Sequence, residues 1–244
     1  MGADRDFPLV SVVIPSLNSA RFLRETLESI LQQDYPKIEC LVIDGGSTDG
    51  TLEILKSYGS RVRWISEPDR GHAHAMNKGL KMSRGEIVAL LNPDDLWEIP
   101  GAARTAVEYL MAHPEVDCVY GRCGSIDAEG NRIGMSYLRE WNLEYAVEYC
   151  DHCIPEPGSF IRRRILEAVH GLDENLYQKK DHDLWLRISL MGGKIQHIPV
   201  LLGHARDTRG LSFDGRTSAP ACVEITKKFF RMPHVPDSLL KKKR

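Results

Sequence analysis

The chain has 244 residues, of which 42% are hydrophobic and 27% charged, and its formal net charge is −2 at pH 7. These values are typical of a soluble globular protein with an extensive core, and the near-neutral charge gives no support for a nucleic-acid partner. No apolar run approaches the roughly 20 residues that a membrane-spanning helix needs, and the first residues lack the apolar core of a signal peptide, so we expect no transmembrane segment and a cytoplasmic location.

The first half of the chain alternates short apolar runs with amphipathic segments. Four segments predict strands, and the continuous apolar runs of the first and the fourth are typical of buried parallel strands. They span residues 9–14, 40–43, 61–65 and 87–91. Apolar residues at helical spacing predict a helix over 20–33, with Asn18 or Ser19 as its N-cap, and shorter helices follow the second and third strands. This alternation predicts an α/β fold with a mostly parallel central sheet flanked by helices.

Each of the four predicted strands ends in a polar loop. The loops read PSLNS, DGGSTDG, EPDRGH and NPDD. Because the carboxyl ends of parallel strands meet at one edge of a sheet, the four loops together predict a ligand-binding crevice at that edge.

The second half of the chain is less regular. A helix is expected over 102–112, a strand over 116–120, a hairpin turn in IDAEGNRIG, a helix in DHDLWLRISLMGG and a final strand in KIQHIPVLL. Residues 138–158 have no clear assignment. The terminal KKKR is expected to be a solvated tail, with at most weak membrane-surface contact. No linker or internal repeat divides the chain, so we expect one domain over residues 1–244.

An acidic doublet, Asp94 and Asp95, follows the fourth strand. One interpretation is a turn in which an aspartate caps the next helix. The other is a site for a hard divalent cation that in turn holds phosphates. In the neighbouring loops, Asp44 is placed to accept hydrogen bonds from a base or ribose, Gly46 allows close backbone approach, and Arg70 is placed to meet phosphate charge.

A second pair of carboxylates, Asp181 and Asp183, begins the helix that carries Trp185. Carboxylates are favoured at helix N-termini, so capping is one interpretation. The other is a site in which carboxylates and an aromatic ring hold a sugar acceptor and remove its proton.

Two other nucleotide-binding motifs are absent, because the chain has neither GxxxxGK[ST] nor GxGxxG after the first strand. DGGST resembles the start of an aspartyl phosphatase site, but Gly46 stands where that site needs a second aspartate. The six cysteines are expected to be reduced thiols. Cys150 and Cys153 have the spacing of half a zinc site or a redox couple, but no second half-site is well formed.

Five segments, in their order and spacing, resemble the family 2 glycosyltransferases with the GT-A fold. They are VSVVIPSLN, VIDGGSTDGT, SEPDRGHAHAMNKGL, GEIVALLNPDDLW and DHDLWLRI, and the match covers about residues 9–212. The resemblance implies an inverting transfer from a nucleotide-diphosphate sugar, with a UDP-sugar as the expected donor and Mg or Mn as the cofactor. It implies a nucleotide-sugar-binding half over about 9–97, an acceptor-side half over about 98–212, and a C-terminal helix and basic tail over 213–244.

The resemblance also implies roles for individual residues. Asp95 is expected to bind the metal, Asp94 to lie by the ribose, and Asp181 to be the catalytic base, with Asp183 and Trp185 contacting the acceptor. The remaining expected donor-binding residues are Pro15, Ser16, Asn18, Asp44, Gly46, Arg70, Gly71, Asn77 and Arg206. We expect Arg206 to close over the donor diphosphate on a flap hinged at Gly210; a solvated loop is the alternative.

Three positions depart from the family pattern. Gly45 stands where a second acidic residue often follows Asp44, and Lys180 replaces the Glu that precedes the base. Thr208 stands two residues after Arg206, where the family often has a histidine. A histidine metal ligand is therefore not implied at this position. The expected product is a cell-surface polysaccharide or glycoconjugate made on a glycan or lipid-linked acceptor. The alternative function is a catalytically silent protein of the same fold that binds sugar-nucleotides or glycans.

Overall fold

The structure is a computed structural model, and it describes residues 7–98, 100–135, 139–151, 154–207 and 215–242. The first half follows the predicted alternation. Its elements are β1 (Val10–Ser16), α1 (Leu23–Leu31), β2 (Ile38–Asp44), α2 (Thr51–Ser57), β3 (Arg63–Ser66), α3 (His72–Met82) and β4 (Ile87–Leu90). Helix α1 begins later than expected, and its N-cap is Phe22 rather than Asn18 or Ser19.

The second half mixes strands and helices. Its elements are β5 (Leu96–Trp97), α4 (Ala102–Ala112), β6 (Cys118–Ile126), β7 (Arg132–Met135), α5 (Leu143–Tyr149), β8 (Ser159–Arg162), α6 (Arg163–Ala168), α7 (Lys180–Leu190), β9 (Ile195–Arg206), α8 (Gly215–Phe229) and α9 (Asp237–Lys242). A 3₁₀ turn, η2, spans Glu156–Gly158. Helix α5 occupies part of the stretch that the sequence left unassigned, and α9 includes the first two lysines of the expected solvated tail.

One sheet runs through both halves in the order β3-β2-β1-β4-β8-β6-β9-β5, and β7 pairs with β6. Strands β3, β2, β1 and β4 are parallel, as predicted. In the second half the pairing is mixed: β6 and β9 are parallel, whereas β8 is antiparallel to both β4 and β6, and β5 is antiparallel to β9. Strands β6 and β7 are joined by a short hairpin, and a connection of that length permits only antiparallel pairing.

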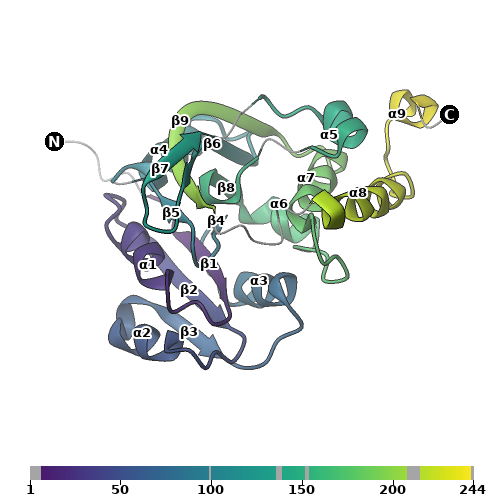
Figure 1. The fold of residues 1–244 in the computed structure, drawn as a ribbon. Coiled ribbons are helices and arrows are strands. Elements are labelled where there is room, and N and C mark those ends of the chain that lie inside the picture. Colours follow the sequence, from purple (N-terminus) through teal and green to yellow (C-terminus); the bar gives the residue numbers. More distant parts are fainter. Residues whose placement is uncertain (1–6, 99, 136–138, 152–153, 208–214, 243–244) are drawn as a thin grey trace.

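Apolar side chains cover both faces of the parallel strands. On β4, Ile87 and Ala89 belong to a core shared with α1, α2 and α4, whereas Val88 and Leu90 belong to a core shared with α3, α6 and α7. Figure 1 shows α1 and α2 on one side of β1 and β2, and α3 on the other. Coverage on both faces explains why these strands are continuous apolar runs.

A third, smaller apolar cluster lies between α5, α7, α8 and α9. It contains Leu176, Leu186, Ile225 and Phe229, all nearly inaccessible to solvent. Figure 1 shows α8 against α7, and α9 at the far end of the molecule from β1–β3. In the part of the chain that the structure describes, no helix is both long and apolar enough to cross a membrane.

Gly79 sets how closely α3 packs on the sheet. A Cβ atom at this position would overlap Val13 Cγ1 and lie 3.2 Å from Ile43 Cγ1. A Cβ atom placed on Gly134, in the exposed strand β7, would have no neighbouring atom within 4 Å. The two glycines therefore form a matched pair of buried and open sites.

We expect Gly79→Ala to lower the free energy of unfolding. Overpacking costs about 1–3 kcal/mol, which exceeds the gain of about 1 kcal/mol from replacing a helical glycine by alanine. Urea denaturation measures the difference, and Gly134→Ala should change stability by no more than about 0.5 kcal/mol. Equal stability of the two variants would show that α3 does not pack as described.

Candidate active site

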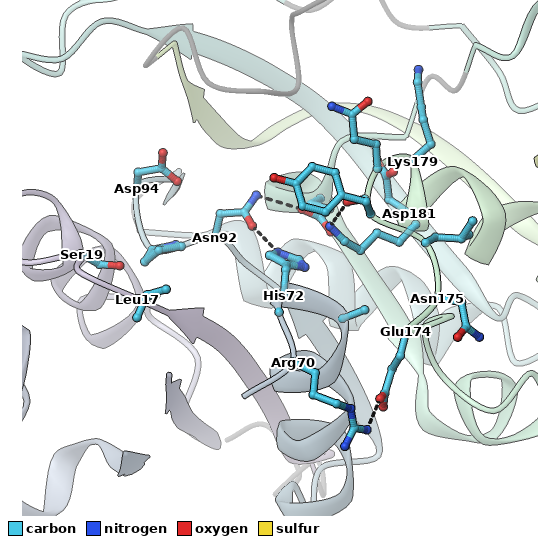
Figure 2. Close-up of a pocket in the computed structure, with 18 of the residues that line it drawn as sticks. Leu17, Ser19, Arg70, His72, Asn92, Asp94, Glu174, Asn175, Lys179 and Asp181 are labelled. Atoms are coloured by element: carbon cyan, nitrogen blue, oxygen red, sulfur yellow. Dashed lines mark hydrogen bonds and ion pairs between the residues drawn. The ribbon is translucent and has the colours of Figure 1, made fainter. Parts of the chain in front are cut away.

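A cleft of about 990 Å³ lies at the carboxyl ends of β1 and β4. Three loops of the first half line one side, at residues 17–22, 70–73 and 92–94. Residues 174–181 and Glu156 line the other side. In Figure 2, Leu17 and Asp94 lie on one side of this cleft, Lys179 and Asp181 on the other, and Asn92 between them. Three of the four polar loops that predicted a crevice line this cleft, and the fourth, at residues 44–50, does not.

The acidic doublet lies in this cleft, with Asp94 at its wall and Asp95 buried behind. Asp95 Oδ1 accepts a hydrogen bond from the Arg206 backbone N–H at 3.0 Å, and Oδ2 accepts one from Asn92 Nδ2 at 3.1 Å. Burial, with the neighbouring Asp94 charge, raises the pKa of Asp95 to about 8. Burial also raises the pKa of Asp94. A bound cation would stabilise the ionised forms of both carboxylates, so the doublet is a candidate cation site.

The donor set suits a cation that shares its ligands with a substrate. In the described part of the chain, no three His, Cys, Asp or Glu side chains are grouped to hold a metal ion. His204 does not supply a third ligand beside the doublet, because its Nε2 lies 2.5 Å from Glu98 Oε2. Mg²⁺ and similar ions are commonly held by one or two carboxylates together with substrate phosphates. Asp94 and Asp95 fit that pattern.

Asp44, at the end of β2, is fully buried and does not line the cleft. Its Oδ2 accepts hydrogen bonds from the Gly46 and Ser47 backbone N–H groups and from Ser66 Oγ, at 3.0, 2.9 and 2.7 Å. Burial acts to raise the pKa of Asp44, but these bonds and one from Ser47 Oγ outweigh it, so the pKa lies below its usual value. Asp44 thus holds the loop after β2 as a permanent anion. Gly46 adopts φ 93°, which favours glycine at this turn.

The loop after β1 is fixed to the loop after β2. Asn18 lines the cleft, its Oδ1 accepts the Thr48 N–H, and its own N–H donates to Ser47 Oγ. Pro15 and Ser16 are buried beneath it at the end of β1. Leu17 was not predicted as a site residue, yet it lines the cleft with 59% of its surface exposed. An exposed leucine in a polar loop is the signal that would have revealed this apolar surface.

One predicted donor-binding residue, Asn77 of α3, does not line the cleft. Asn77 Nδ2 donates to the Leu172 carbonyl at 2.8 Å, and its Oδ1 accepts the Leu172 N–H at 2.9 Å. Asn77 therefore holds residues 172–174 in place, and its expected donor contact is corrected to a supporting role. Arg70 and Gly71 do line the cleft, but Arg70 Nη2 is paired with Glu174 Oε2 at 2.6 Å.

Asp181 lines the far wall in the first turn of α7. Glu156 of η2 lies in the same wall, and its Oε2 accepts a hydrogen bond from Asn92 Nδ2 at 2.9 Å. Burial raises the pKa of Glu156, and the Asp181 charge adds to this. Burial lowers the pKa of Lys180, against the attraction of both carboxylates. Glu156 was not predicted as a site residue. It lies 64 residues from Asn92 in the sequence, and only the tertiary fold brings the two side chains together.

The structure corrects the expected acceptor contacts of Asp183 and Trp185. Asp183 is fully buried between Arg187, at 2.7 Å, and Lys228 of α8, at 2.5 Å. Two residues along a helix correspond to a rotation of about 200°, so Asp183 faces away from Asp181. Trp185 lies one turn deeper, is 1% exposed and belongs to the core. Among the described residues, the phenyl and phenol rings that line the cleft are instead those of Phe22 and Tyr177, and Tyr177 is 74% exposed.

Arg206 supports the acidic doublet from behind. Its side chain is fully buried, donates from Nε to the Asp94 carbonyl at 3.0 Å and pairs with Glu25 at 2.6 Å. Its guanidinium also lies 4.5 Å from the centre of the Phe22 ring. Such fixed contacts correct the expectation that Arg206 rides on a mobile flap. Gly210, the expected hinge, falls outside the described residues.

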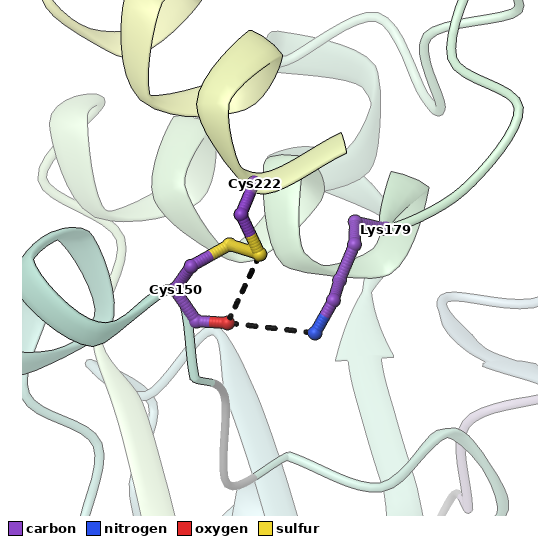
Figure 3. Close-up of a disulfide and its surroundings, with 3 residues drawn as sticks. All are labelled: Cys150, Lys179 and Cys222. Atoms are coloured by element: carbon purple, nitrogen blue, oxygen red, sulfur yellow. Dashed lines mark hydrogen bonds between the residues drawn. A yellow bond between two sulfur atoms is a disulfide. The ribbon is translucent and has the colours of Figure 1, made fainter. Parts of the chain in front are cut away.

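The expectation that all six cysteines are reduced thiols is wrong for Cys150 and Cys222, and the alternative Cys150–Cys153 couple is not formed either, because Cys150 pairs with Cys222. Cys150 and Cys222 form a disulfide between the end of α5 and α8, with their Cα atoms 5.6 Å apart (Figure 3). Cys153 lies outside the described residues. Cys40, Cys118 and Cys123 are buried thiols, as expected. Burial raises the pKa of Cys40 to about 12, so it is an unreactive core residue.

Comparisons with known proteins agree with this geometry. The chain is 30% identical over 188 residues to the chondroitin synthase of Escherichia coli, covering 76% of this chain and 27% of the relative. It is 33% identical over 226 residues to the O-antigen biosynthesis protein RfbC of Myxococcus xanthus, covering 87% of this chain and 17% of the relative. This chain thus spans about a quarter or less of the length of these relatives.

Solved structures share the fold. TarS 1-349 of S. aureus in complex with UDP-GlcNAc matches with a TM-score of 0.75 and 19% identity, over 94% of this chain and 68% of that fragment. The mannosyltransferase PcManGT from Pyrobaculum calidifontis, in complex with GDP-Man and Mn2+, matches with a TM-score of 0.72 and 24% identity, over 98% of this chain and 70% of the enzyme. These likenesses confirm the expected GT-A fold.

The family model described as glycosyl transferase family 2 matches residues 11–169, which include β1, the acidic doublet and Glu156. The match extends over more than half of the chain. The chain belongs to glycosyl transferase family 2.

Proposed function

We propose that this chain is an inverting glycosyltransferase that moves a sugar from a nucleotide-diphosphate donor to a hydroxyl group of a glycan or lipid-linked acceptor. The expected product is a cell-surface polysaccharide or glycoconjugate. One observation carries the proposal: a single cleft has an acidic doublet on one wall and Asp181 on the other. Sugar transfer needs carboxylates that bind a cation for the donor diphosphate. It also needs a carboxylate that accepts the proton of the acceptor hydroxyl.

The relatives support this assignment. Chondroitin synthase and the O-antigen protein are named for polysaccharide synthesis, and TarS and PcManGT were solved with nucleotide sugars. We take a UDP-sugar as the expected donor. Its nucleoside would lie over Leu17 and Asn18, in the loop that Asp44 stabilises, and Gly71 would allow the diphosphate to approach the start of α3.

Asp94 and Asp95 would hold a divalent cation, Mn or Mg, as the Mn2+ in PcManGT supports. When bound, such a cation neutralises the charge that develops on the departing diphosphate. The protein's own contribution is to hold both carboxylates in place. Arg206 and Asn92 do so by hydrogen bonds to Asp95, and the Arg206 side chain holds the Asp94 carbonyl.

Asp181 acts as the general base in a single displacement. It would accept the proton of the acceptor hydroxyl as the oxygen attacks the anomeric carbon from the face opposite the diphosphate. Glu156 is less suited to this role, because burial raises its pKa and keeps it protonated over a wider pH range. The positive charge of Lys180 interacts with the carboxylates of Glu156 and Asp181, and this reduces the repulsion between them.

We predict that Mn²⁺ strengthens UDP binding in a pH-dependent manner. Below a pKa of about 8, Asp95 carries a proton that the cation must displace. Affinity should therefore rise by up to about tenfold per pH unit as the pH increases towards 8, and then level off. Calorimetric titration of UDP with Mn²⁺ or with chelator, at pH 6, 7 and 8.5, measures this.

Asp95→Asn should abolish the Mn²⁺ enhancement, whereas Asp237→Asn in α9, away from the cleft, should retain it. If UDP binds equally with metal and with chelator at every pH, the doublet does not hold a cation.

We predict that Asp181→Asn keeps UDP and Mn²⁺ affinity while sugar transfer falls about 10²- to 10⁴-fold, since a general base contributes that much to the rate. The substitution retains the shape of the side chain and removes its ability to accept a proton. Transfer from a UDP-sugar panel and calorimetric UDP binding are measured on the same preparations.

Two variants identify the base unambiguously. Asp183→Asn should lower the thermal stability, because it weakens the pairs with Arg187 and Lys228, but the folded protein should still transfer sugar. Glu156→Gln should retain most of the activity. A collapse of transfer in Glu156→Gln, with Asp181→Asn near wild type, would assign the base to Glu156.

A further inference from the structure

One cation on the acceptor side of the cleft has no carboxylate partner. Among the cleft-lining cations that the structure describes, Arg70 is paired with Glu174, and Lys180 interacts with Glu156 and Asp181. The hydrogen bond from Lys179 Nζ goes to the Cys150 carbonyl, at 3.4 Å. Lys179 therefore lines the cleft as a cation that makes no ion pair with a described carboxylate.

The segment that carries Lys179 is held in a defined conformation. Lys179 adopts φ 57°, an uncommon backbone conformation for a residue with a side chain, immediately before α7. Lys180 Nζ donates to the Tyr177 carbonyl at 2.9 Å, and Cys150 is bonded to Cys222 on α8. Figure 3 shows the Lys179 side chain reaching towards the Cys150 carbonyl beside the disulfide. A lysine that served only solubility would not need this support.

An aromatic ring lies in the same segment. Tyr177 lines the cleft with 74% of its surface exposed, although most tyrosines of this fold are half-buried or buried. The flat apolar face of a pyranose ring packs well on an exposed aromatic ring. Tyr177 and Lys179 are two residues apart. A charged sugar could pack its C–H face on the Tyr177 ring and pair its anionic group with Lys179.

We propose that Tyr177 and Lys179 form a subsite for an acceptor sugar that bears an anionic group, with Tyr177 under the ring and Lys179 bound to the anion. The group is a carboxylate or a phosphate. This proposal rests on the proposed glycosyltransferase function and adds the chemical class of the acceptor. A charge-assisted hydrogen bond in a cleft gives selectivity over the neutral sugar, which would leave Lys179 without its counter-charge.

Three probes of the same ring test the proposal by ligand-observed NMR titration: methyl β-glucuronide, glucose 6-phosphate and methyl β-glucoside. The full chain is saturated with UDP and Mn²⁺, so that the probes compete only for the acceptor side. For the wild type, we expect at least one anionic probe to bind about tenfold more tightly than the glucoside, as one charge-assisted hydrogen bond allows. The probe that gains identifies the anion as carboxylate or phosphate.

Variants assign the selectivity to its residues. Lys179→Gln should bring the anionic and neutral probes to within about twofold, and Tyr177→Ala should weaken all three alike, because selectivity and ring contact reside in different side chains. Lys81→Gln, at the exposed end of α3, is the matched control and should behave as wild type. Calorimetric UDP affinity, measured separately, should be unchanged in all variants.

Two results would overturn the subsite. One is equal or absent binding of the anionic and neutral probes in the wild type. The other is a loss of UDP affinity in Lys179→Gln, which would place Lys179 in the donor site. If either result occurs and the protein still turns over a UDP-sugar normally, the glycosyltransferase function is retained. If the protein turns over no UDP-sugar but still binds the anionic probes selectively, that function is rejected and the subsite is retained.

Discussion

The hydrogen bond from the Arg206 backbone to Asp95 joins the two halves of the molecule at the acidic doublet. Arg206 ends β9, and Asp95 follows β4, 111 residues earlier in the chain. The Arg206 side chain then reaches Asp94, the hairpin between β6 and β7 at Asp127, and α1 at Glu25. A buried guanidinium is tolerated only when its donors are satisfied, so these segments are fixed relative to one another. The position of the doublet depends on that arrangement.

The carboxylates around the cleft have different environments and hence different protonation behaviour. Asp44 is surrounded by N–H and O–H donors, so it stays ionised despite its burial. Asp95 has fewer donors and a second carboxylate beside it, so a cation would favour its ionised form. Glu156 is half-buried, accepts a hydrogen bond from one amide donor and keeps its proton more readily. Environments that separate the pKa values of neighbouring carboxylates allow one cleft to hold both structural and reactive acids.

Much of the first half was predictable from sequence because its signals are local. Strands β1, β2 and β4 are apolar runs buried on both faces, whereas the edge strand β3 is partly exposed, and each strand ends in a polar loop. The acidic doublet could be placed for the same reason. The second half was less predictable, because β8 and β9 pair with strands distant in sequence, and Glu156 meets Asn92 only through that pairing.

Two errors in the second half of the chain have simple physical causes. Asp183 looked like a partner of Asp181 in sequence, but the helical repeat turns it towards Lys228 on the C-terminal helix α8, whose packing against α7 no local pattern indicates. Trp185 was expected to contact an acceptor sugar, but its large ring, one turn into α7, packs in the core instead. Arg206 was expected on a flap over the donor diphosphate. Its support of the doublet depends instead on an extension of β9 that the apolar pattern does not contain.

The Cys150–Cys222 disulfide divides the molecule in its dependence on the redox environment. The bond closes a loop of 72 residues that contains β8, α6, α7 and β9, whereas β1, β2, β3 and β4 lie outside it. On the chain-entropy model, such a closure restricts the unfolded chain by about 4 kcal/mol. In an oxidising compartment this loop is covalently confined. In a reducing one, where such bonds do not persist, separation of α8 from α7 is still opposed by the Lys228 ion pairs and the small apolar cluster.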